Sequence, residues 1–311
     1  MRSKAIYKRL QGELMEDKNF FEAKDVIQYL TELAQNKTFV FRGFGKQQEL
    51  LPNIIRKQDL TNREIELLSS FEKYGLQYFA VNNAIDFMSF AQHYGLPTRL
   101  LDFTYNPFVA LFFALFMSKG TNYTDEEDKD YYYIRYCDLK EHIVFNSLPS
   151  IVMAEDSFFK ADSFTFQCKK SIDTINRILQ SLDKEYNEKD IEIQTILMYC
   201  KTVYRNLHQY DSRTNMEELK QYIDETLDKF HQGRILFIDA NQCSNRIVMQ
   251  QGLFMFPYEL NKERHKEIII KNTSVIRIHK SCRNDLLSYL DTMGLNSFRL
   301  MPDLQSVCYA I

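Results

Sequence analysis

A ten-residue apolar run, from Phe108 to Met117, constrains the fold of this chain more than any other part of its sequence. Asn106 can cap a helix and Pro107 suits the first helical position, so we predict a helix at about residues 107–118. Because this helix is apolar on all sides, we expect it to be central in the core. Ten residues fall short of the roughly 20 that cross a bilayer, so no membrane partner is expected.

The remaining hydrophobic pattern predicts helices and short strands around this central helix. Apolar residues at helical spacing predict helices at 21–33, at 61–74 after the capping box Thr61-Asn-Arg-Glu64, at 85–94 before Gly95, and at 282–293. Segments rich in β-branched and aromatic residues predict strands at 38–41, 131–136, 234–238, 246–249, 253–256, 267–270 and 274–278. The mixed charge run 262–267 is typical of a solvated turn. We therefore predict an α+β fold with a mixed or antiparallel sheet packed by helices.

The pattern also divides the chain into three parts. Residues 169–232 contain three successive helical patterns separated by charged turns, which predicts an inserted helical subdomain and a candidate surface for a protein partner. The α+β domain then comprises residues 37–168 and 233–311, and residues 1–36 form an N-terminal helical segment. A length of 311 residues is sufficient for this organisation.

Composition and charge exclude several classes of protein. The 39 Lys and Arg residues against 42 Asp and Glu give a net charge of −3, which argues against a broad nucleic-acid-binding surface. The six cysteines form no CxxC pair, so neither a zinc site nor a small disulfide scaffold is indicated. The N-terminal residues lack the apolar core of a signal peptide, which favours the cytoplasm. No GxxxxGK[ST], GxGxxG, GxSxG or HExxH motif occurs, which argues against P-loop nucleotide hydrolases, Rossmann enzymes, α/β hydrolases and zincins.

Arg42 is the first candidate for a functional site. It is followed by Gly43, at the predicted end of an apolar strand, where a buried guanidinium group needs a partner. A structural salt bridge is the alternative.

The second candidate is a polar loop between two apolar helices, a common setting for binding residues. The loop contains Gln92, His93, Tyr94, Thr98, Arg99, Asp102 and Thr104. The structural alternative is that Arg99 pairs with Asp102, Thr98 caps a turn and His93 is a satisfied core histidine.

The third candidate runs from Arg246 to Gly252, where Gln250 and Gln251 end a strand and a glutamine can donate hydrogen bonds to a ligand and accept them from it. A plain hairpin with glutamines at its edge fits this segment as well.

These segments together resemble the FRG domain of prokaryotic and phage proteins, which is named for its Phe-Arg-Gly tripeptide. The matching parts are residues 41–43, 49–56, 93–114, 246–254 and 298–304. The matches extend over about 37–145 and 234–311 and leave 169–232 as an elaboration. Phe103 departs from the family pattern, in which Trp is most often expected. The resemblance implies that Arg42, the segment Thr98–Arg99–Asp102 and Gln251 lie near one another.

Three functions fit these observations. The first is a cytosolic regulatory or defence-associated binding module whose arginine-lined pocket holds a small anionic ligand, either phosphorylated or a nucleotide. Gly43, Gln92, His93, Tyr94, Thr98, Arg99, Thr104 and Arg246 are then the binding candidates, with Arg42 and Arg99 as a phosphate clamp.

The second is an ADP-ribosyltransferase-like enzyme that uses NAD, since Arg42 is similar to the strand-end arginine of the arginine-serine-glutamate class. Arg42, Asp102 and Gln251 are its catalytic candidates, and an aromatic neighbour such as Phe44 or Tyr94 can stack on the nicotinamide ring. That chemistry needs a carboxylate near the ribose. The expected Glu-x-Glu does not occur at residues 250–252, so Asp102 or Glu259 has to substitute. The third function is a nuclease-like toxin in phage defence. No cofactor other than NAD, and no metal, is indicated.

Overall fold

The computed structural model describes residues 17–46, 50–75, 84–116, 129–145, 232–239, 245–257 and 260–301, with a few single positions between 165 and 229. The predicted helical insertion at 169–232 lies outside the described residues apart from such single positions. The division into three parts therefore stays a prediction. Among the described residues, no helix is long and apolar enough to span a membrane.

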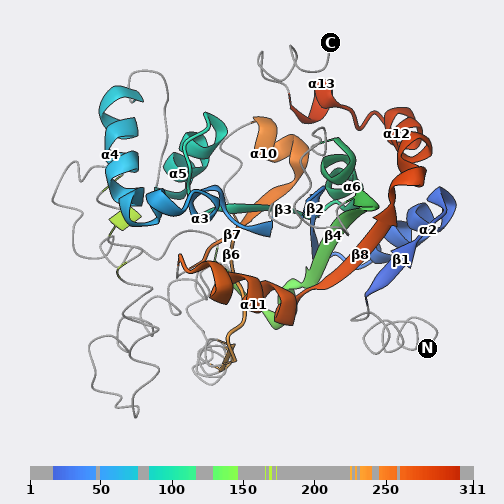
Figure 1. The fold of residues 1–311 in the computed structure, drawn as a ribbon, viewed down its shortest axis with the longest axis horizontal. Coiled ribbons are helices and arrows are strands. Elements are labelled where there is room, and N and C mark those ends of the chain that lie inside the picture. Colours follow the sequence, from blue (N-terminus) through green and yellow to red (C-terminus); the bar gives the residue numbers. More distant parts are fainter. Residues whose placement is uncertain are drawn as a thin grey trace, which may run out of the picture.

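The described strands form one eight-stranded mixed sheet, in the order β1-β8-β4-β2-β3-β7-β6-β5 (Figure 1). The strands are β1 (Lys18–Phe20), β2 (Phe39–Phe44), β3 (Leu101–Thr104), β4 (Tyr131–Asp138), β5 (Ile143–Phe145), β6 (Leu236–Ile238), β7 (Gly252–Met255) and β8 (Ser274–His279). The two outermost pairs, β1 with β8 and β5 with β6, are parallel, and the others are antiparallel. The predicted α+β class is confirmed.

Helices cover both faces of this sheet. They are α2 (Ala23–Leu33), α3 (Asn53–Arg56), α4 (Glu64–Gly75), α5 (Ala84–His93), α6 (Pro107–Phe116), α10 (Asn245–Gln250), α11 (Lys262–Asn272), α12 (Arg283–Thr292) and α13 (Ser297–Leu300). On one face α2, α6 and α12 share a hydrophobic cluster with β2, β4 and β8. On the other, Ile269 of α11 packs with Val40 and Tyr133. Helices α4 and α5 pack over β6 and β7 (Figure 1).

Helix α6 is the predicted central helix, and local chemistry explains where it begins and how closely it packs. The Asn106 side chain accepts a hydrogen bond from the Phe108 backbone N–H at 3.0 Å, as predicted for a cap. On β2, a Cβ atom at Gly43 would lie 1.7 Å from the carbonyl oxygen of Ala110. Gly43 therefore lets α6 approach the strand backbone to a distance that any side chain prevents.

Two predicted strands are helices in the structure. Residues 246–249 belong to α10, and 267–270 belong to α11. Helix α11 also includes the charge run 262–267, which was predicted to be a turn. Its start is set by Asn261, whose side chain accepts a hydrogen bond from the Arg264 N–H at 3.0 Å. Burial of His265 and Ile269, four residues apart, then follows the helical period and not the strand period.

Other differences concern strand β3 and the start of α4. Strand β3 lies within the segment that was predicted to be a polar loop, and three of its four side chains are buried, with Asp102 exposed. Strands β1 and β5 were also missed. Helix α4 begins at Glu64, but the Glu64 carboxylate binds Arg99 instead of completing the predicted capping box. Helix α5 ends as predicted, with Gly95 at φ 89°.

Candidate functional site

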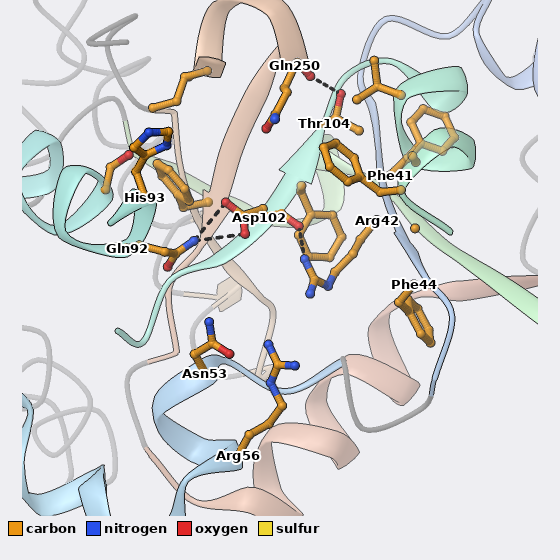
Figure 2. A pocket seen from close by; sticks show the side chains of 18 residues that line it. Phe41, Arg42, Phe44, Asn53, Arg56, Gln92, His93, Asp102, Thr104 and Gln250 are labelled. Atoms are coloured by element: carbon orange, nitrogen blue, oxygen red, sulfur yellow. Dashed lines mark hydrogen bonds between the residues drawn. The ribbon is translucent and has the colours of Figure 1, made fainter. Parts of the chain in front are cut away.

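The candidate site is a pocket that opens where β2 and β3 diverge. These antiparallel strands have one residue pair in register, Phe41 with Thr104. Beyond it, β2 continues to pair with β4. The Asp102 carbonyl oxygen instead accepts a hydrogen bond from Nη1 of Arg42 at 2.7 Å (Figure 2). A side chain thus takes the place of a strand–strand hydrogen bond, and a cavity of about 260 Å³ lies at this point.

Arg42 was predicted at the end of its strand, but it lies inside β2, which continues to Phe44. The pocket takes its walls from the sheet and from four helices. Its lining consists of Phe41, Arg42, Gly43, Phe44, Asn53, Arg56, Ser89, Gln92, His93, Asp102, Phe103, Thr104, Val109, Ala110, Phe113, Ile247, Gln250 and Phe254. Of the residues predicted to form the site, the structure brings Arg42, Gly43, Gln92, His93, Asp102 and Thr104 to this pocket.

One part of the pocket carries two guanidinium groups. Arg42 is half-buried on β2, whereas Arg56 is an exposed residue at the end of α3. Both side chains point into the pocket, Arg56 toward Arg42, and Asn53 lies on the same helix (Figure 2). The charge of Arg42 also acts on the neighbouring interior. Burial, with a smaller effect from Arg42, lowers the pKa of His265 to about 4, so this imidazole is neutral at pH 7.

Another part of the pocket is built from a chain of hydrogen bonds that ends at Asp102. The fully buried Thr98 donates from its hydroxyl to Oε1 of Gln92 at 2.5 Å. Nε2 of Gln92 donates to both carboxylate oxygens of Asp102, at 3.0 Å each. Thr98 thus contributes through Gln92 and is not among the lining residues. His93 lies beyond Gln92 at the end of α5 (Figure 2).

Arg99 is not at the pocket, so the predicted clamp of Arg42 and Arg99 is wrong. Its side chain is 5% exposed and forms a buried ion pair with Glu64. Nη1 of Arg99 also donates to the carbonyl oxygen of Pro257 at 2.9 Å. The alternative pairing of Arg99 with Asp102 is wrong too, because the partner of Arg99 is the distant Glu64. The polar segment 92–104 therefore contributes residues both to the pocket lining and to a buried ion pair in the core.

Tyr94, the other aromatic candidate in this segment, is 67% exposed. Its ring packs against Phe90, with the ring centroids 4.8 Å apart, and it does not line the pocket.

The third predicted segment reaches the pocket through a different glutamine. Gln251 has a φ of 48° in the turn before β7, and its carbonyl oxygen accepts a hydrogen bond from the Tyr105 N–H. Gln250 lines the pocket in its place. The Thr104 hydroxyl donates to the Gln250 carbonyl oxygen at 2.6 Å, which ties β3 to α10. Arg246 lies on α10, and its side chain is outside the described part of the chain.

Asn53 and Arg56 were not predicted as site residues, although both line the pocket together with Phe44, the predicted aromatic neighbour, and Gln250 of the third candidate segment. A signal existed for Arg56, which ends the segment 49–56 that resembles the FRG pattern. Asn53 carries no signal of its own, because only the packing of α3 beside β2 gives it this position. Among the described residues, no group of three or more His, Cys, Asp or Glu side chains is arranged to hold a metal ion.

One family model matches the part of the chain that contributes most of the pocket lining. Residues 37–122 match the family model of the FRG domain. The matched segment runs from β2 to α6 and includes Arg42, Arg56, Gln92 and Asp102. The chain therefore contains an FRG domain over these residues. No curated protein and no solved structure shows significant similarity to it.

Proposed function

We propose that this pocket binds a small phosphorylated ligand, such as a nucleotide, and that the protein acts as a cytosolic regulatory or defence-associated binding module. The observation that carries this proposal is that Arg42 and Arg56 point into one pocket. A guanidinium group presents several N–H donors in a planar fork, which matches the oxygens of a phosphate group. Because the guanidinium groups of Arg42 and Arg56 line the same cavity, an anion bound between them is favoured.

The remaining lining suits the organic part of such a ligand. The partly buried Phe113 presents aromatic surface, on which a base or a sugar ring can pack. Asn53 adds amide donors on the same helix as Arg56. An apolar cavity with a few converging polar groups is the usual form of a small-molecule site.

The test is the affinity of the purified protein for adenosine diphosphate, measured by titration calorimetry. Arg56→Gln should weaken binding about tenfold or more, because a hydrogen bond to a charged group is lost. Arg56 is suited to this test because it is exposed, whereas Arg42 also bonds the backbone of β3. Arg63→Gln is the matched control, since Arg63 pairs with Glu66 on the surface away from the pocket. Equal affinity of the wild type and Arg56→Gln would refute the proposal.

A second function, ADP-ribosyl transfer from NAD, is favoured by one specific observation. The Asp102 carboxylate lines the same pocket as Arg42, although the sequence lacks the expected Glu-x-Glu. Cleavage of the bond between ribose and nicotinamide builds positive charge on the sugar, which a nearby carboxylate can stabilise. Incubation with NAD should then release nicotinamide, and Asp102→Asn should abolish the release. No release by the wild-type protein with any acceptor would remove this alternative.

The nuclease-like alternative and the protein partner at residues 169–232 stay predictions.

A further inference from the structure

Asp102 is an acidic side chain in a pocket whose other polar part carries two guanidinium groups. Its side chain is exposed on β3, and both of its carboxylate oxygens accept hydrogen bonds from Nε2 of Gln92. A carboxylate has about four acceptor positions, so Gln92 leaves capacity for further donors. The pocket thus offers donors to a ligand on one side and acceptors on the other.

The orientation of the Gln92 amide is determined by its two neighbours. Asp102 only accepts hydrogen bonds, so the NH₂ group of Gln92 must face it, and Oε1 must face Thr98. The Thr98 oxygen accepts a hydrogen bond from the Leu100 N–H at 3.3 Å, which leaves the hydroxyl hydrogen available for Gln92. Thr98 is 0% exposed, so water does not compete for this hydroxyl group. The chain from Thr98 to Asp102 therefore has one consistent direction.

We propose that Asp102 makes this pocket selective for phosphorylated ligands that carry sugar hydroxyl groups, and that Thr98 is a positioning residue acting through Gln92. This inference rests on the proposed function, because it assigns a second contact to the same phosphorylated ligand. A hydroxyl group donates a hydrogen bond to the carboxylate and offsets the unfavourable charge that a phosphate meets there. A phosphate-containing ligand without hydroxyl groups meets the repulsion and lacks this compensation. The favoured class is therefore a nucleotide or sugar phosphate.

The test compares adenosine diphosphate with its 2′,3′-dideoxy analogue, which has the same base and phosphates but lacks the ribose hydroxyl groups. The wild type should bind adenosine diphosphate about tenfold or more tightly than the analogue, since a hydrogen bond to a charged group is lost. Asp102→Asn should reduce this ratio to near one and should bind inorganic pyrophosphate more tightly than the wild type. Titration calorimetry measures all of these affinities.

Thr98→Val and Thr98→Ser separate a positioning role from a purely structural one. Valine has the shape of threonine without the hydroxyl donor, so Thr98→Val should lower the ratio of the two affinities several-fold while the dideoxy analogue binds as before. Thr98→Ser keeps the hydroxyl group and should keep the wild-type ratio. Should Thr98→Val fail to fold, Asp102→Asn still decides the selectivity, and Thr98→Ala, which also lacks the hydroxyl group, decides the positioning role by the same ratio.

The outcomes also distinguish the inference from the function on which it rests. Equal wild-type affinity for the two nucleotides, with weaker binding of both by Arg56→Gln, overturns the selectivity and leaves the phosphate site intact. Failure of Arg56→Gln to weaken either nucleotide overturns the proposed function itself. An unchanged ratio in Thr98→Val, beside a reduced ratio in Asp102→Asn, overturns the positioning role of Thr98 alone.

Discussion

The buried ion pair between Arg99 and Glu64 leads to a quantitative prediction about stability. The two side chains are 5% and 4% exposed. Nε of Arg99 lies 3.1 Å and 2.9 Å from the two carboxylate oxygens, and Nη2 donates to the same group. The backbone N–H of Arg99 also donates to Glu64, at 3.2 Å. Removing one partner of such a pair leaves a buried charge uncompensated, so Glu64→Gln should reduce the free energy of unfolding by about 3–5 kcal/mol.

Arg99→Met removes the other partner of the pair and leaves the Glu64 carboxylate buried without its cation. This substitution should therefore also reduce the free energy of unfolding by about 3–5 kcal/mol.

Urea unfolding followed by circular dichroism measures these differences, with Glu66→Gln as the control. Glu66, two residues after Glu64 on α4, forms an exposed ion pair with Arg63, so this substitution should leave the urea midpoint unchanged. A cost of less than about 1 kcal/mol for Glu64→Gln would contradict the argument from burial. Because Arg99 is away from the pocket, folded Arg99→Met should bind adenosine diphosphate like the wild type. Weaker binding of adenosine diphosphate by Arg99→Met would mean that Arg99 contributes to the ligand site after all.

Two further predictions concern Gly43 and the buried histidines. Gly43→Ala should destabilise the protein by about 3 kcal/mol or more in urea unfolding, because its Cβ atom would overlap the Ala110 carbonyl oxygen of α6; an unchanged midpoint would mean that α6 can move away. Burial lowers the pKa of both His265 and His142 from 6.5 to about 4, so the unfolded state binds more protons between these values. Stability should be complete above about pH 6.5 and should fall by about 2 kcal/mol for each histidine between pH 7.5 and 5. His265→Gln should weaken this pH dependence by that amount, and an unaltered dependence would show that the folded protein protonates His265 freely.

Elements with strong local signals were predicted correctly from the sequence. The helix α6 has a cap, a proline at its first position and an uninterrupted apolar run, and all three act within a few residues. The errors at 246–249 and 267–270 involve short apolar segments, for which helix and strand patterns differ little. The strand β3 was missed because its four residues are stabilised by pairing with β7, which lies about 150 residues away in the chain. Long-range pairing of this kind leaves little trace in the local sequence.

The candidate site also has features that the local sequence predicts and features that depend on tertiary contacts. The sequence alone determined that Arg42, Gln92 and Asp102 are polar residues beside apolar elements, and that Arg42 and Asp102 belong to an FRG-type pattern. Only the tertiary structure decided which arginine accompanies Arg42. Arg99, three residues from Asp102 in sequence, points into the core toward Glu64, whereas Arg56 reaches the pocket from α3. The physical reason is that a charged side chain takes the partner that folding brings within reach, and neither chain order nor residue type reveals that partner.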